Sequence, residues 1–177
     1  MKRTYFVVPL FFYLITGCNS STGPSSEAYQ YLPLNTGNRW YYNSNGISDT
    51  NSINVTWEVS GQTEINGKQY YELTQQNLTT NYTDTLFYRF NGDILFCLRV
   101  NYPEQIIADF SLDLNDTTYW QNDLKVVEKT GDIIKYETPF STDYGYSITF
   151  KKGIGITSMI RNGFVYNKLT LIKSELK

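Results

Sequence analysis

The residue types that most often carry catalysis are sparse in this chain, because its 177 residues include no histidine. That absence removes Ser-His-Asp triads, Cys-His dyads and histidine-based zinc or iron sites. Hydrolysis would have to depend on carboxylates alone, and a glycosidase needs two of them about 5 to 10 Å apart across a cleft. No sequence motif identifies such a carboxylate pair among the 17 Asp and Glu residues. We therefore predict a protein that is not an enzyme and has no cofactor.

The densest acidic segment spans residues 109–117 and could in principle bind calcium. Asp113, Asn115 and Asp116 place oxygen atoms at positions i, i+2 and i+3, and calcium is bound by oxygen-rich loops. The segment lacks the central glycine and terminal glutamate of an EF-hand, and two leucines interrupt it. The favoured interpretation is a strand that runs into an Asx-type turn, with no metal bound.

Aromatic side chains are the unusual feature of the composition. Sixteen tyrosines and three tryptophans exceed what a core of this size buries, so some rings must be exposed or line a cleft. The candidates for ligand-facing aromatics are Trp40, Tyr42, Trp57 and Trp120. For Trp40 and Tyr42 the favoured alternative is structural, because both point to one face of a strand and would anchor a hairpin in the core.

One of the two cysteines lies near the N-terminus, after residues that have the order of a signal peptide. Lys2 and Arg3 precede an apolar stretch over residues 4–16, which is the order of a signal peptide. The stretch has 13 residues and contains Pro9, whereas a membrane-spanning helix needs about 20. A transmembrane anchor is therefore not expected.

The stretch runs into Leu14-Ile15-Thr16-Gly17-Cys18, which resembles the bacterial lipobox. The resemblance implies that residues 1–17 are removed as a signal peptide and that Cys18 becomes the first residue, carrying acyl chains such as palmitate. Two or more buried chains hold a protein stably on a bilayer. The alternative is an ordinary cleaved signal followed by a chance cysteine.

The remainder of the chain is one domain of ordinary length with an acidic balance. Removing residues 1–17 leaves 13 cations and 17 acids, a net charge of −4, which argues against nucleic-acid binding. Cys97 is then the only cysteine besides Cys18, so no intramolecular disulfide is expected. Its apolar flanks predict a buried thiol that behaves as a small apolar residue.

The pattern along the chain predicts an all-β fold. Residues 18–28 read as the lipidated cysteine and a flexible serine-rich linker, and residues 29–177 as a single domain. Residues 53–59 alternate apolar and polar side chains without error, and Asn66-Gly67 is the most favoured kind of hairpin turn. We expect about ten strands in a sequential antiparallel meander, strongly curved into an open barrel, with a two-sheet β-sandwich as the alternative.

The segment from Tyr31 to Tyr42 (YLPLNTGNRWYY) resembles the opening of the mature domain in a large group of bacterial lipoproteins. Tyr70-Tyr71, Phe87-Tyr88-Arg89 and residues 153–156 are similar to later parts of the same family. Residues 115–120 depart from it, because members have Gly-Asp and a closer tryptophan there. The family has no shared activity, so the resemblance implies localisation and fold only.

These observations favour a membrane-tethered cell-envelope protein that binds a partner through an aromatic face or the mouth of a curved sheet. An envelope protein or a polysaccharide is the expected partner, beside the membrane itself. The first alternative is a lipid or lipoprotein carrier with an apolar lumen, and the second a carboxylate-only glycan hydrolase. The outer membrane is the expected location of the anchor.

Overall fold

The structure is a computed structural model and describes residues 25–44, 52–117, 123–138, 145–162 and 167–177. Cys18 and Trp120 lie outside the described residues.

Within these ranges the chain forms one short helix and eleven strands. They are α1 (Ser26–Tyr31), β1 (Arg39–Ser44), β2 (Val55–Ile65), β3 (Lys68–Asn77), β4 (Tyr82–Asn91), β5 (Ile94–Arg99), β6 (Gln105–Asp109), β7 (Lys125–Lys129), β8 (Ile133–Glu137), β9 (Gly145–Lys151), β10 (Gly155–Asn162) and β11 (Asn167–Glu175).

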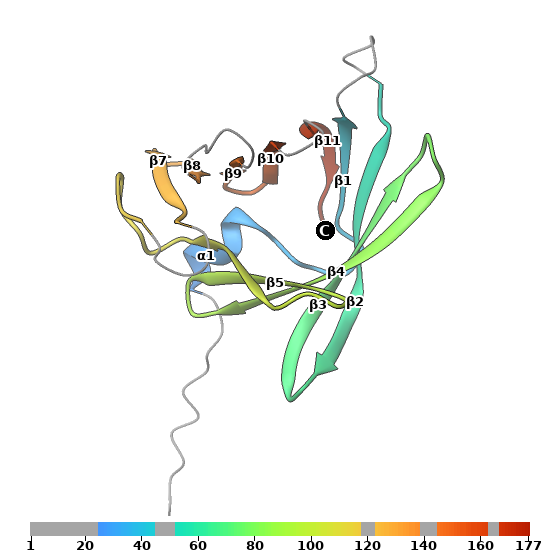
Figure 1. Cartoon of the computed structure of the whole chain (residues 1–177), viewed down its shortest axis with the longest axis horizontal. Helices are drawn as coiled ribbons and strands as arrows, with labels where there is room; N and C mark the ends of the chain where they lie inside the picture. The colour runs from blue at the N-terminus through green and yellow to red at the C-terminus, as the bar shows by residue number, and fades with distance from the viewer. Residues whose placement is uncertain (1–24, 45–51, 118–122, 139–144, 163–166) are drawn as a thin grey trace, which may run out of the picture.

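All eleven strands belong to one antiparallel sheet that curls without closing (Figure 1). Sequential neighbours pair throughout, except that β6 and β7 form the two edges and the first strand pairs with the last. The prediction of an open, strongly curved meander is therefore confirmed, and the β-sandwich alternative is not what forms. Curling brings the two edges toward each other, which limits the unpaired backbone that a long flat sheet would expose.

The connection from β6 to β7 crosses the gap between the edges. The backbone N–H of Asn115 donates to the carbonyl of Val126 at 2.9 Å, and the N–H of Val126 donates to the carbonyl of Asp116 at 2.9 Å. These bonds pair part of the outer side of β7 with the connection, so this edge is partly covered.

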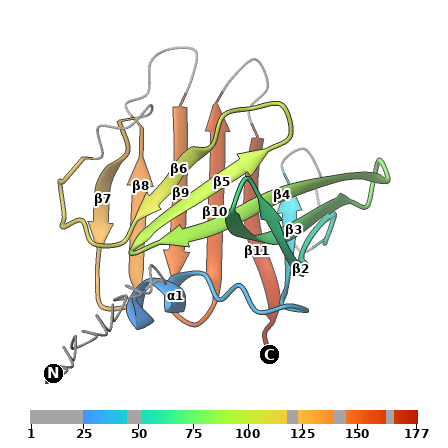
Figure 2. The ribbon, with the colours of Figure 1, turned by 90° about the horizontal axis from the view of Figure 1, so that it is seen from below.

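Helix α1 packs inside one end of the curved sheet (Figure 2). Ser25 caps it by accepting a hydrogen bond from the N–H of Ala28 at 3.0 Å, and the residue before Pro33 leaves the helical conformation. Ala28 is fully buried. The last residues of the predicted linker over residues 18–28 therefore belong to the folded part of the chain, since Ser25 caps α1 and Ala28 lies in the core. A six-residue helix has too few turns to show the apolar periodicity by which helices are recognised.

Aromatic side chains fill the interior next to α1. Phe110 lies at the centre: its ring stacks on that of Tyr31 at 5.1 Å and meets that of Phe150 edge-on at 5.1 Å. Phe90 and Tyr136 lie 6.3 Å from the same ring. Such offset and edge-to-face contacts are the favourable arrangements for ring pairs. All strands, α1 and this cluster lie within residues 25–177, so a chain that starts at Asn19 keeps every described contact of the fold.

The hairpin turn at Asn66-Gly67 has the backbone geometry that its sequence predicts. Asn66 and Gly67 have φ of 52° and 75°, as a two-residue turn with positive φ at both positions requires. The turn between β9 and β10 ends at Gly155, whose φ is 105°. The indole of Trp40 lies against Gly155, and its Nε1 donates a hydrogen bond to the carbonyl of Ile154 at 2.5 Å.

Candidate functional site

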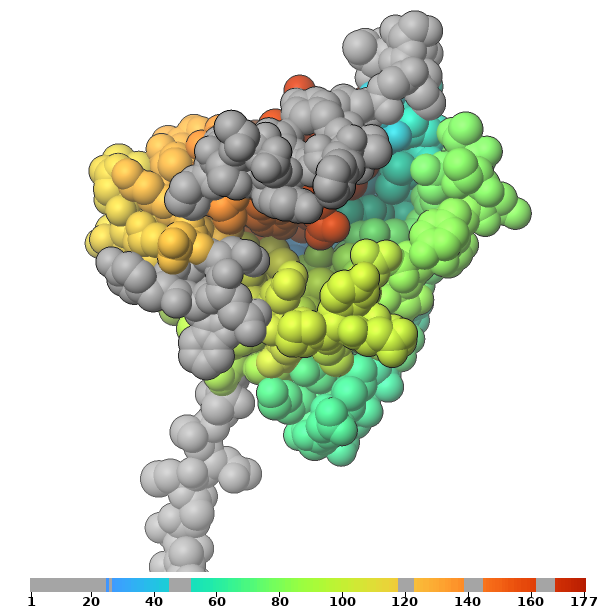
Figure 3. Space-filling view, in the orientation of Figure 1, coloured from blue at the N-terminus to red at the C-terminus, as the bar shows by residue number. Residues whose placement is uncertain are grey.

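A cavity of about 900 Å³ occupies the other end of the curved sheet. Strand β10 runs from one end of the curved sheet to the other: it starts beside α1 and reaches the cavity at Arg161. Figure 3 looks into the hollow between the β5–β6 connection and the C-terminal strands. Its volume lies in the upper part of the roughly 300–1,000 Å³ typical of small-molecule sites. The lining residues come from both halves of the chain.

Strict alternation along β4 supplies much of one wall. Tyr82, Asp84, Leu86 and Tyr88 all line the cavity, because residues two apart in a strand share a face. The first two are polar and lie near the β3–β4 turn, whereas Leu86 and Tyr88 are buried. The wall formed by β4 is therefore polar near the β3–β4 turn and becomes apolar farther along the strand.

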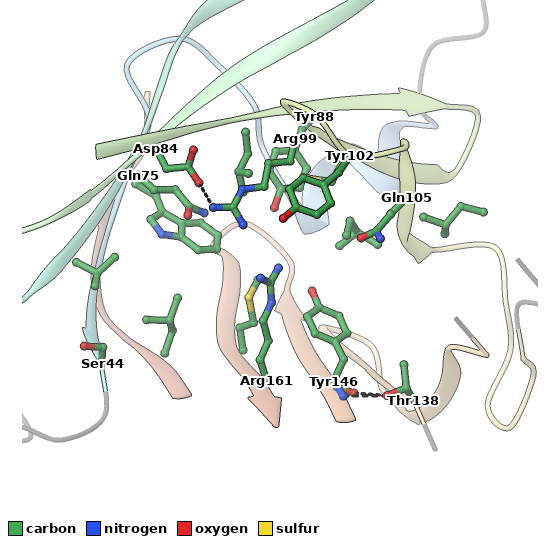
Figure 4. A pocket seen from close by; sticks show the side chains of 18 of the residues that line it. Ser44, Gln75, Asp84, Tyr88, Arg99, Tyr102, Gln105, Thr138, Tyr146 and Arg161 are labelled. Atoms are coloured by element: carbon green, nitrogen blue, oxygen red, sulfur yellow. Dashed lines mark hydrogen bonds and ion pairs between the residues drawn. The ribbon is translucent and has the colours of Figure 1, made fainter. Parts of the chain in front are cut away.

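An ion pair holds the polar part of this wall. Arg99, at the end of β5, donates from Nη2 to Oδ2 of Asp84 at 2.7 Å. The guanidinium of Arg99 also lies 5.8 Å from the ring centroid of Tyr102, in the β5–β6 connection. Figure 4 shows Arg99 and Tyr102 side by side above the cavity.

The opposite wall presents a second arginine and tyrosine. Arg161 of β10 and Tyr146 of β9 are direct cross-strand partners, and the guanidinium lies 5.8 Å from the ring centroid. Thr138 fixes the backbone of Tyr146 by accepting a hydrogen bond from its N–H at 2.8 Å. In Figure 4 Arg161 and Tyr146 rise from these strands toward Arg99 and Tyr102.

Two buried polar atoms of the lining have no hydrogen-bond partner among the described residues. They are Nε1 of Trp57 and the hydroxyl of Tyr146. Buried donors are nearly always paired in folded proteins, and each unpaired one costs about 1–3 kcal/mol. Two unpaired buried polar atoms in the lining of one cavity are expected where a polar group of a ligand binds.

Cys97 contributes a thiol to the same cavity. It is half-buried rather than buried as predicted, and it packs against the core. Burial raises the pKa of the Cys97 thiol to about 11, so the thiol stays protonated at neutral pH. A protonated thiol is a poor nucleophile, and the residue acts as a small apolar part of the wall.

The aromatics singled out by sequence fall into three groups. Trp57 lines the cavity. Trp40 and Tyr42 do not; both are buried in the core, where the hydroxyl of Tyr42 donates to the carbonyl of Ile156 at 3.0 Å. Trp120, like the proposed lipid-bearing Cys18, lies outside the described residues. Sequence reasoning missed Arg99, Arg161 and Tyr146. The available signal for Arg99 was a charged residue at the end of an otherwise apolar strand.

The acidic segment 109–117 begins as the sequence predicts. Strand β6 ends at Asp109, whose Oδ1 accepts a hydrogen bond from the N–H of Ser111 at 3.1 Å, which is an Asx turn. Within the described ranges no three Asp, Glu, Cys or His side chains gather closely enough to hold a metal ion.

A charged cluster outside the cavity fixes the β5–β6 connection that carries Tyr102. Glu104 accepts two hydrogen bonds of 2.6 Å from Arg89 and one of 2.5 Å from Tyr70, and Lys68 lies at 3.3 Å. Partial burial raises the pKa of Glu104, but the hydrogen bonds from Arg89 and Tyr70 outweigh burial and lower the pKa to about 2. The carboxylate therefore braces one wall of the cavity.

We expect Glu104→Gln to destabilise the fold by on the order of 2 kcal/mol at pH 7, because it leaves the largely buried Arg89 without its charge partner. A lowered carboxyl pKa stabilises the folded state above the usual value of 4.5, and this stabilisation is lost as the pH falls toward 2. The stability difference between wild type and Glu104→Gln should therefore shrink over that range in urea titrations.

The matched control is Glu58→Gln, which removes an exposed ion pair with Arg39 and should cost much less. A stability gap between wild type and Glu104→Gln that stays constant from pH 5 to pH 2 would contradict the brace.

Comparisons with known proteins give little guidance. No family model matches the chain, and no curated protein matches it. Among solved structures, a presumed lipoprotein from Parabacteroides distasonis is similar with a TM-score of 0.46 and 12% identity, covering 82% of this chain and 98% of that one. This likeness is too distant to carry an inference about function. Among the described residues, no helix has the length and apolar character needed to cross a bilayer.

Proposed function

We propose that this protein is a lipid-anchored component of the bacterial cell envelope whose β domain binds a small ligand without chemical turnover. The anchor rests on the sequence from Leu14 to Cys18. The binding role rests on one observation: a cavity of about 900 Å³ whose lining mixes an apolar surface with arginines, tyrosines and two unpartnered buried polar atoms. Small-molecule sites combine these same elements.

Binding is a better explanation of the cavity than hydrolysis. The carboxylates that line it among the described residues are Asp84 and Asp123. Asp84 is held by Arg99 at 2.7 Å, an arrangement that serves to position the arginine. A carboxylate-only hydrolase needs instead two acids that face each other with separate roles.

Carriage of a lipid is the second candidate, and a specific observation favours it. A lumen filled by side chains would speak against a carrier, whereas here the apolar lining encloses space, with Leu86, Ile106, Met159 and Leu169 among its walls. Curved β-sheets of this size can shelter one small ligand. If the protein carries a lipid, its ligand is a small amphiphile in place of the envelope protein or polysaccharide expected from the sequence.

Binding is tested by narrowing the cavity from both walls. We expect the chain from Asn19 to bind the neutral dye N-phenyl-1-naphthylamine, with a rise in dye fluorescence. Cys97→Trp combined with Leu169→Trp should weaken this binding at least roughly tenfold, because the two indoles would occupy the space between β5 and β11.

The control for this pair is Cys97→Ala with Leu169→Ala, which leaves the space open and should retain dye binding. Melting curves establish that both double variants fold. Dye binding that is absent from the wild type, or that is unaffected by the two tryptophans, would refute the proposed function.

Anchoring is tested separately on the full chain expressed in a bacterium. The protein extracted from membranes should start at Cys18 and carry the added mass of acyl chains, and Cys18→Ser should release it into the soluble fraction. Recovery of an unmodified Cys18 thiol from the membrane-bound protein would exclude the anchor.

A further inference from the structure

Two arginine–tyrosine pairs face each other across the cavity. Arg99 lies against Tyr102 on one wall and Arg161 against Tyr146 on the other, each with 5.8 Å between guanidinium and ring centroid. Figure 4 shows both guanidinium groups directed into the same space. The two arginines are 62 residues apart in the sequence, so the fold alone brings them together.

The two arginines differ in their charge partners. Arg99 is neutralised by Asp84 at 2.7 Å. Arg161 has no carboxylate within ion-pair distance among the described residues, and Asp123, which also lines the cavity, pairs with neither arginine. Within the described part of the chain, no carboxylate in direct contact compensates the charge of Arg161 in the cavity.

The surroundings of Arg161 offer further hydrogen-bond donors to an anion. The hydroxyl of Tyr146 is buried and has no partner among the described residues. Burial raises the pKa of Tyr146, so the phenol remains protonated and can donate. A guanidinium presents a planar set of N–H donors that matches the oxygens of carboxylate and phosphate groups.

The rest of the lining suits a hydrocarbon. Leu86, Ile106, Leu124 and Met159 are buried or nearly so, and they line the same cavity as the arginines. A ligand that satisfied Arg161 alone would leave this apolar surface uncovered, and a purely apolar ligand would leave a charge and two buried donors without partners.

We propose that the natural occupant is an amphiphile with a single anionic headgroup, bound with its headgroup at Arg161 and Tyr146 and its hydrocarbon chain along the apolar wall. This assignment rests on the proposed binding function and adds the chemical class of the ligand.

The test is calorimetric titration of the chain from Asn19 with two probes of equal chain length, dodecanoate and dodecanol, below their aggregation limits. The anion should bind the wild type roughly tenfold more tightly or better, since a hydrogen bond to a charged group is worth at least that much. Arg161→Gln should abolish this preference while leaving dodecanol binding within about twofold.

Lys168→Gln is the matched control. Lys168 lies on the neighbouring strand β11 and next to Leu169, which lines the cavity, so alternation places it on the outer face. The Lys168→Gln substitution removes one positive charge, as Arg161→Gln does, and should leave the preference for dodecanoate intact. Tyr146→Phe, which removes only the hydroxyl, should reduce the preference by a smaller factor than Arg161→Gln.

The outcomes separate the two proposals. Equal binding of dodecanoate and dodecanol by the wild type would overturn the anionic headgroup while leaving the cavity a binding site. A preference that survives Arg161→Gln, or that Lys168→Gln also removes, would overturn the assignment to Arg161. Failure of both probes and of the neutral dye to bind would overturn the binding function itself.

Discussion

Phe110→Ala should lower the free energy of unfolding by about 3–5 kcal/mol. Phe110 is almost completely buried, and its ring contacts side chains of α1, β4, β8 and β9. Removing it leaves a void among rings that belong to both halves of the sheet, and the cost of such a void adds to the lost transfer free energy. Urea denaturation followed by near-ultraviolet circular dichroism measures the loss.

The control for Phe110→Ala is Tyr102→Ala, which removes an aromatic ring that is 61% exposed and should change stability by less than about 0.5 kcal/mol. Phe110→Leu retains most of the apolar volume and should fall between the two. A Phe110→Ala protein that loses less than about 1 kcal/mol would show that the rings repack, and that the cluster does not join the halves of the sheet.

The second large effect is expected at Gly155. Its φ of 105° lies in a region that L-residues rarely adopt, and an added Cβ would come within 2.7 Å of Nε1 of Trp40. The indole cannot easily move, because it is fully buried and bonded to Ile154. Gly155→Ala should therefore cost about 2–4 kcal/mol, from backbone strain and overpacking together.

Gly153→Ala separates the two contributions within the same turn. Gly153 has φ of 70°, and an added Cβ would meet no atom within 4 Å. Only the backbone strain of about 1–2 kcal/mol applies there. Equal losses for the two alanine variants, measured by thermal and urea unfolding, would mean that contact with Trp40 contributes nothing.

Local patterns in the sequence predicted the strands and the curvature but not which strands pair across the chain. The alternation over residues 53–59 and the Asn66-Gly67 turn specify β2 and its hairpin, because both signals are contained in a few residues. The pairing of β1 with β11 joins residues such as Trp40 and Ser174. No local pattern encodes a pairing over that separation.

The candidate site was hard to predict for the same reason. Arg99 and Arg161 each look like a surface charge at the end of a strand, and only the pairing of β1 with β11 in the curled sheet places them opposite each other. For Trp40 the favoured structural interpretation agrees with the structure, since its indole is held in the core against Ile154 and Gly155. Trp57, selected as a candidate ligand-facing aromatic, does line the cavity.

If the chain is anchored at Cys18 as proposed, the position of α1 determines which end of the domain faces the membrane. The described chain begins at Ser25 beside α1, at the end of the molecule opposite to the C-terminal end of β10 (Figure 2). On the proposed anchoring at Cys18, six residues (19–24) separate the lipid from Ser25, and a fully extended segment of six residues spans about 20 Å at most, which is shorter than the roughly 40 Å width of a domain of this size. A connecting segment of this length would not easily allow the domain to reverse its orientation relative to the membrane. If the proposed anchor and the proposed ligand binding both hold, the ligand would therefore reach the cavity from the aqueous compartment and not directly from the anchoring bilayer.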